Sequence, residues 1–279
     1  MRNRMINNKG MGTVMAAFAV TTSAKEENAV LAATARQWAE ELGVRYVPRE
    51  KGQTLPAMLV RYGLAALLIA AETGPRVYTP EGTMFYHPGL GTVRWQRVVL
   101  KGEGDNFLRA LAVRPGQKVL DATLGLAADA LLASHAVGPS GRVTGLEASP
   151  LLYFLTSRGV QNYEGKFPEL TQDLRRIEVV QAEASAYLKQ LPADSYDVVC
   201  FDPMFRHPVR RSSTMQPLRP LAWRLPLSTE TVDEALRVAP RVVIKERTEE
   251  VLREYGCRTF TGTRYSGVRF GIRTRGEKN

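Results

Sequence analysis

The segment VLDATLGLAADA, residues 119–130, decides the fold, because an apolar β-rich run leads through Asp, Thr and Gly into a helix-forming stretch. It belongs to a series of five β-rich runs separated by helical stretches or longer connections. The runs lie at 118–122, 142–147, 177–181, 197–201 and 241–245. Strands that alternate with helices form a mostly parallel sheet covered on both faces. The sequence therefore predicts an α/β protein.

The N-terminal third predicts a smaller α/β subdomain. We expect a strand over 16–22, a helix over about 26–42 and a second helix over 55–71, followed by short strands and turns. Because the regular alternation of strands and helices begins only later, we place the domain boundary near residue 100. Residues 1–100 are expected to cover the substrate side of the main domain, residues 101–279.

The C-terminal segment departs from the βα alternation. CRTFTGTRYSGVRFGIRT, residues 257–274, fits two strands joined by a Ser-Gly turn. We therefore expect an antiparallel hairpin at the end of an otherwise parallel sheet.

Charge is distributed in blocks along the chain. The protein carries 38 Lys and Arg against 28 Asp and Glu, a formal net charge of +10. Residues 1–112 carry 14 basic and 9 acidic side chains, a net charge of +5, and residues 113–202 carry 8 and 11, a net charge of −3. Residues 203–240 carry 6 and 3, a net charge of +3, and residues 241–279 carry 10 and 5, a net charge of +5. The basic segments thus sum to +13 around an acidic one. Such basic runs are typical either of a protein that binds a polyanion or of an ordinary solvated surface.

The composition, 44% hydrophobic and 24% charged, excludes a disordered, collagen-like or coiled-coil protein. Two cysteines, Cys200 and Cys257, are too few for a disulfide framework or a cysteine-rich zinc site and indicate a reducing compartment.

The basic start and the short apolar run 14–20 loosely resemble a secretory signal but fit a first strand equally well. The run 62–71 is too short to span a bilayer. We expect a cytoplasmic protein with no membrane segment and, since its three histidines lack ligand spacing, no metal site.

Acidic residues lie at or beside the ends of four of the predicted strands. They are Asp121, Glu147, Glu183 and Asp202, the last in the sequence Asp202-Pro203. Ligands of open α/β sheets bind at the carboxyl ends of the strands. Each acid alone also fits a structural role, as a helix cap, a turn or a surface carboxylate. The first loop lacks GxGxxG, which argues against a dinucleotide site.

Taken in order, these segments resemble a known family. The motifs VLDATLGLAADA, TGLEAS, VVQAEA and VVCFDPMF are similar to those of class I S-adenosylmethionine-dependent methyltransferases. LDATLGL, DPMF and RVVIKER more specifically resemble the bacterial small-subunit ribosomal RNA guanine-N2-methyltransferase family, as does LKGEGDNFLRAL upstream. The resemblance covers about residues 89–273 and implies a Rossmann-like sheet.

The resemblance implies that S-adenosylmethionine is the cofactor and that the first loop and the following strand ends contact it. The implied contacts are Asp121, Thr123, Gly125, Ala128, Asp129, Glu147, Ala148, Glu183, Ala184 and Asp202. Ala127 and Ala128 stand where the family has a glycine and an arginine, so contacts there can only be made by the backbone. Glu183-Ala184 likewise replaces a serine pair.

The DPMF motif suits methylation of an exocyclic amine, whose lone pair is delocalised into the base. We expect Asp202 and the Pro203 carbonyl to accept its two N–H bonds and Phe205 to stack on the base, which orients the nitrogen for attack. The methyl donor is already activated, so this chemistry requires neither a strong base nor a metal.

The basic segment after DPMF predicts contacts to RNA. The candidates are Arg206, His207, Arg210, Arg211 and Arg219; a solvated loop is the alternative. The expected substrate is guanine N2 of small-subunit ribosomal RNA. Two alternatives remain open: a methyltransferase for a small-molecule or protein amine, and a non-catalytic RNA-binding assembly factor that retains the fold. The sequence does not indicate an oligomeric state.

Overall fold

The computed structural model describes residues 17–23, 28–203, 225–262 and 267–276. The chain divides into two compact units, one made mainly of the residues up to Tyr86 and one that begins at His87. Whether residues 1–100 form a substrate-side subdomain stays a prediction. Among the described helices, none combines the length and the apolar character needed to cross a membrane.

The first unit is a four-stranded sheet with two helices. Its elements are β1 (Phe18–Thr22), α1 (Ala29–Leu42), α2 (Leu55–Tyr62), β2 (Ala66–Ala71), β3 (Gly74–Thr79) and β4 (Gly82–Phe85). The strands are in the order β1-β2-β3-β4, with β1 and β2 parallel and the other pairs antiparallel. Ala19, Met58, Leu67 and Ile69 belong to its hydrophobic core.

The expected helix over residues 55–71 is wrong in its second half. Helix α2 ends at Tyr62 because Gly63 adopts φ 60°, in the left-handed region, and donates its N–H to the carbonyls of Leu59 and Val60. Residues 66–71 (ALLIAA) then form the buried strand β2 between β1 and β3. A short apolar run fits a buried strand and a buried helix equally well, and here strand pairing decides.

The second unit confirms the predicted fold class. Its strands are β5 (Lys118–Asp121), β6 (Arg142–Glu147), β7 (Ile177–Gln181), β8 (Val198–Phe201), β9 (Arg241–Glu246), β10 (Thr259–Thr261) and β11 (Arg269–Thr274). The first five match the predicted strands to within one residue at each end. All seven strands form one sheet in the order β10-β11-β9-β8-β5-β6-β7. Strands β5 to β9 are parallel, and β11 pairs antiparallel with both β9 and β10, as expected for a terminal hairpin.

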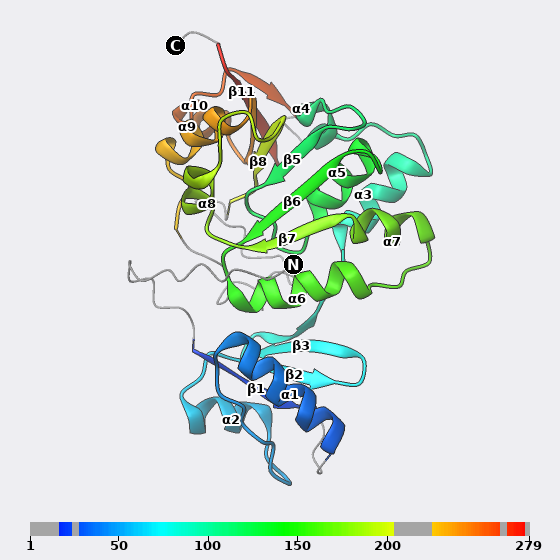
Figure 1. The fold of residues 1–279 in the computed structure, drawn as a ribbon, viewed down its shortest axis with the longest axis vertical. Helices are drawn as coiled ribbons and strands as arrows, with labels where there is room; N and C mark the ends of the chain where they lie inside the picture. The colour runs from blue at the N-terminus through cyan, green and yellow to red at the C-terminus, as the bar shows by residue number, and fades with distance from the viewer. Residues whose placement is uncertain (1–16, 24–27, 204–224, 263–266, 277–279) are drawn as a thin grey trace. The chain divides into compact units, whose positions relative to one another are not determined.

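Helices cover both faces of this sheet. They are α3 (Leu90–Val99), α4 (Asn106–Leu111), α5 (Ala128–Val137), α6 (Pro150–Asn162), α7 (Pro168–Arg175), α8 (Ala184–Gln190), α9 (Thr229–Val238) and α10 (Glu249–Glu254). Figure 1 shows α8 and α9 on one side of the sheet and α3 and α5 on the other. Leu188 of α8, Val232 of α9 and Leu252 of α10 belong to one core cluster with sheet residues such as Phe201 and Ile244.

A buried polar cluster joins α3, α5 and α7. The Trp95 indole Nε1 donates to Asp173 Oδ2 at 2.7 Å, and the Ser134 hydroxyl donates to the Asp173 carbonyl at 2.6 Å. Trp95 is fully buried. Because buried polar groups need partners, these bonds fix how α3 packs on α5, the helix that begins at the predicted cofactor loop.

Both cysteines are buried and unbridged. Cys200 lies within β8, and burial raises the pKa of its thiol well above the usual value. This thiol is inert, as expected for a cysteine inside a central strand.

Candidate active site

The carboxyl ends of four adjacent strands bring the predicted acids together. Asp121 ends β5, Glu147 ends β6 and Asp202 directly follows β8. Strand β9, next to β8, adds Lys245 one residue before its end. Because these strands are parallel, their carboxyl ends share one edge of the sheet, where ligands of such folds bind.

The loop after β5 is closed by hydrogen bonds to its neighbours. Oδ1 of Asp121 accepts from the Thr123 N–H at 3.1 Å. The Gly125 N–H donates to Glu147 Oε2 at 3.1 Å, and the Thr156 hydroxyl donates to the Gly125 carbonyl at 2.7 Å. Gly125 has φ 54°, a left-handed conformation that glycine adopts without strain. The loop therefore needs both its glycine and the carboxylate at the end of β6.

Helix α5 begins directly after this loop. Its N-cap residue, Ala127, has φ 63°, a conformation that costs an alanine roughly 1 kcal/mol or more. Ala128 and Asp129 form the first turn of α5. A side chain at Gly91 of α3 would stand 3.0 Å from the Ala128 Cα, so α3 and the start of α5 pack closely.

Glu183 has a structural role that the sequence left open. It is the N-cap of α8, and its carboxylate oxygens accept from the N–H groups of Ser185 at 3.0 Å and Ala186 at 2.8 Å. Ala184 is the first residue of that helix. Strand β7, which precedes Glu183, pairs with β6 so that Gln181 stands opposite Glu147. The cofactor contacts assigned to Glu183 and Ala184 stay predictions.

Lys245 is the centre of an ion-pair network. Its Nζ lies 2.6 Å from Asp202 Oδ2 and 3.1 Å from Asp129 Oδ2. Arg94 of α3 contacts the other oxygen of Asp129 and binds both oxygens of Asp105 at 2.9 and 3.0 Å. The sequence predictions did not include Lys245 or Arg94. A lysine at the end of the apolar run RVVIK was the available signal for Lys245.

Burial and charge separate the protonation states of the acids. Burial, reinforced by the charge of Asp129, raises the pKa of Asp121 to about 8. Burial acts in the same direction on Asp129, but Lys245 and Arg94 outweigh it and lower the pKa of Asp129. Burial and the charge of Asp129 raise the pKa of Asp202, with Lys245 opposing them. At neutral pH the site therefore holds a protonated Asp121 beside an ionised Asp129.

Asp202 has one carboxylate oxygen with no partner in the described part of the chain. Its backbone N–H donates to the Thr123 hydroxyl at 2.5 Å, and its Oδ2 accepts from Lys245. Its Oδ1 has no hydrogen-bond partner among the described residues, and 36% of the side chain is exposed. Pro203 follows, and the described part of this segment ends there. The predicted site residues outside the described part are Phe205, Arg206, His207, Arg210, Arg211 and Arg219.

Acids pair with several arginines of the basic C-terminal segment. Arg273 lies 2.7 Å from Asp233, Arg275 lies 2.6 Å from Asp194, and Arg269 contacts Glu249. Their charges are locally compensated. This part of the sequence's positive charge therefore contributes less to an RNA surface than its count suggests.

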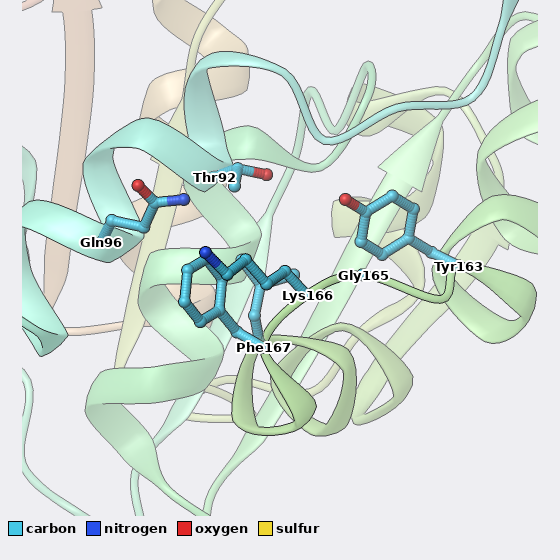
Figure 2. Close-up of a pocket in the computed structure, with 7 residues that line it drawn as sticks. Thr92, Gln96, Tyr163, Gly165, Lys166 and Phe167 are labelled. Carbon is cyan, nitrogen blue, oxygen red and sulfur yellow. The ribbon is translucent and has the colours of Figure 1, made fainter.

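A pocket of about 240 Å³ lies elsewhere in the second unit. Figure 2 shows Thr92 and Gln96 of α3 on one side and the segment that includes Tyr163, Lys166 and Phe167 on the other. None of its lining residues is a predicted site residue. Within the described ranges, no group of three or more His, Cys, Asp or Glu side chains is arranged to hold a metal ion.

Comparison with known proteins agrees with this geometry. The family model described as "Putative SAM-dependent methyltransferase" matches residues 83–266. The uncharacterized protein YpiP of Bacillus subtilis (strain 168) is 39% identical over 212 residues, which are 76% of this chain and 81% of the relative.

More distant relatives include a named ribosomal RNA enzyme and a solved structure. Ribosomal RNA small subunit methyltransferase J of Alkalilimnicola ehrlichii is 32% identical over 131 residues, and the match covers 46% of this chain and 47% of that protein, about half its length. A SAM-dependent methyltransferase structure from Neisseria gonorrhoeae shares the fold, with a TM-score of 0.58 at 19% identity over 94% of this chain and 97% of that one. The chain therefore belongs to the family of putative SAM-dependent methyltransferases, and S-adenosylmethionine is its cofactor.

Proposed function

We propose that this methyltransferase modifies an exocyclic amine of a nucleobase in RNA, with guanine N2 of small-subunit ribosomal RNA as the expected target. The observation that carries the proposal is Asp202, which follows a central strand, is held by Thr123 and Lys245, and keeps Oδ1 without a partner among the described residues. Relatives named ribosomal RNA small subunit methyltransferase J support the choice of RNA.

The donor set at the carboxyl edge fits the cofactor. Glu147 is a buried carboxylate at the end of β6, and a carboxylate has acceptor sites enough for both the Gly125 N–H and ribose hydroxyls. A Cβ at Gly125 would meet no heavy atom of the described residues within 4 Å, so a ligand can approach the backbone of this loop.

We assign the remaining cofactor contacts to the loop and the next strand ends. When bound, S-adenosylmethionine supplies a methyl group already activated by its sulfonium. The assigned residues are Asp121, Thr123, Gly125, Ala128, Asp129, Ala148, Glu183, Ala184 and Asp202. Ala128 would contribute only its backbone, because its side chain is a methyl group.

Asp202 and Pro203 act on the amine. Asp202 Oδ1 and the Pro203 carbonyl would each accept one N–H bond, which favours a tetrahedral nitrogen and turns its lone pair towards the methyl carbon. Transfer would form the methyl–nitrogen bond and break the methyl–sulfur bond, leaving S-adenosylhomocysteine, and the nitrogen would release one proton. The Asp202 carboxylate would accept this proton and pass it to water, since its side chain is partly exposed.

RNA binding would depend on the basic segments outside the acidic block. A base in RNA reaches a pocket only when it is unstacked or single-stranded. Phe205 is assigned to stacking, and the arginines and histidine between 206 and 219 to phosphate contacts. These assignments lie outside the described residues.

The test is methyl transfer in vitro to small ribosomal subunits from a strain that lacks the gene. We expect transfer of the label from radiolabelled S-adenosylmethionine to the RNA. This transfer should be weakened by salt and lost in Asp202→Ala. Transfer that is insensitive to salt and that goes to a small molecule or protein would favour the alternative substrate class. The observation that favours this alternative is that acids pair with C-terminal arginines and compensate their charge.

A further inference from the structure

Lys245 is a lysine placed almost at the end of a central strand. Its side chain is 19% exposed, and its neighbours Ile244 and Glu246 are buried. Lysines are rarely so buried without ionic partners. Its two partners, Asp202 and Asp129, come from different elements: one follows β8 and the other lies in the first turn of α5.

The two ends of this bridge depend on Lys245 to different degrees. Asp129 also contacts Arg94, so its negative charge keeps a cationic partner without Lys245. For Asp202, in contrast, Lys245 is the only cation in contact among the described residues. The Asp202 backbone is held separately by Thr123. Loss of Lys245 would therefore leave the chain in place and release the Asp202 carboxylate.

We propose that Lys245 is a positioning residue for methyl transfer: its ammonium holds Asp202 Oδ2 so that Oδ1 faces the substrate amine as an ionised acceptor. This inference rests on the proposed role of Asp202. It adds that the carboxylate is oriented from β9 and is linked through Asp129 to the cofactor loop. Lys245 itself does not touch the amine.

The titratable groups around Asp202 predict how its pKa responds to the loss of Lys245. Lys245 comes from β9, Asp129 from α5, Asp121 from β5, Cys200 from β8, and Arg94 from α3 through Asp129. Burial and the neighbouring acids favour the protonated form of Asp202, and Lys245 is the contacting group that opposes them. Without Lys245, Asp202 would stay protonated to a higher pH and would lose acceptor capacity as well as orientation.

The experiment compares Lys245→Met with Lys245→Arg and with a control, Lys118→Met. Lys118 begins β5 at the opposite edge of the same sheet, and its side chain is exposed. Carbon-13 NMR of aspartate-labelled protein, with Asp202→Asn to assign the resonance, measures ionisation without substrate. In Lys245→Met we expect the Asp202 titration midpoint to rise by about one pH unit or more. Lys118→Met should leave it unchanged.

Kinetics with small ribosomal subunits from the deletion strain provide the second readout. We expect Lys245→Met to lower kcat by roughly 10- to 100-fold with the cofactor KM changed less than about threefold, and to shift the acidic limb of the pH profile upward. Lys245→Arg should recover part of kcat, which a general loss of folding would not explain. An unchanged Asp202 titration, or a normal kcat and pH profile in Lys245→Met, would overturn the inference. If the wild type is active on RNA, the proposed function stands in that case. If wild type does not methylate RNA, the proposed function fails, and the NMR titration still decides whether Lys245 controls Asp202.

Discussion

Replacement of Glu147 by Gln and by Ala separates the two tasks of its carboxylate. In the structure it accepts the Gly125 N–H at 3.1 Å within a buried environment, and we also assign it to the hydroxyls of the cofactor ribose. A hydrogen bond to a charged group contributes about 1.5–3 kcal/mol. Gln keeps one acceptor oxygen but loses the charge, so we expect cofactor binding roughly tenfold weaker. Ala loses both contacts, and we expect a loss of about 3 kcal/mol or more, over a hundredfold.

Isothermal titration calorimetry with S-adenosylmethionine measures these losses. The matched control is Glu178→Gln on β7, since Glu178 pairs with Arg142 and its side chain is 47% exposed. The control should bind as wild type does. A Kd for Glu147→Ala within twofold of wild type would refute the assignment of Glu147 to the ribose.

Three further predictions concern the loop and its surroundings. Because the pKa of Asp121 is raised to about 8 from an unfolded value near 3.8, the native state binds more protons between these pH values, and the Asp121 contribution to stability falls as pH rises. In urea denaturation, the stability of wild type minus that of Asp121→Asn should therefore decline from about pH 4 to 8, and parallel curves would contradict this. Gly145→Ala would place a Cβ 2.4 Å from Leu124 Cδ1. We therefore expect the free energy of unfolding, measured by chemical denaturation, to fall by about 1–3 kcal/mol, and calorimetry to show weaker cofactor binding. Wild-type values in both assays would show that the Leu124 side chain moves freely. Ala127→Gly relieves the strain of an alanine at φ 63° and should stabilise the protein by up to about 1 kcal/mol in chemical denaturation. Destabilisation would argue against this loop conformation.

The sequence predicted the second unit well because local pattern and topology agree there. Each β-rich run is short, apolar and bounded by turn residues, so the strands from Lys118 to Glu246 appear as expected. In the first unit, the run 55–71 held two elements, and Gly63, in a left-handed conformation, marks the break. The hydrophobic pattern alone could not distinguish a continuing helix from a strand that pairs with β1 and β3.

The site was predictable where its residues end strands and not where they meet through space. Parallel strands brought Asp121, Glu147 and Asp202 to one edge as expected. Lys245 meets Asp202 across 43 residues and Asp129 across 116, contacts that depend on the order of strands in the sheet. A motif marks the acids because each ends a strand or directly follows one. The lysine that ends the apolar run RVVIK was the local signal for the cation, but it does not indicate which acids Lys245 pairs with.

The most direct test of the central claim is mass-spectrometric mapping of methylated nucleosides in small-subunit ribosomal RNA. RNA is compared from the wild-type strain, a strain that lacks the gene, and that strain complemented with wild type or with Asp202→Ala. We predict that one N2-methylated guanosine disappears on deletion and returns with wild type but not with Asp202→Ala. An unchanged set of methylated nucleosides in the deletion strain would contradict the assignment of this RNA as the substrate.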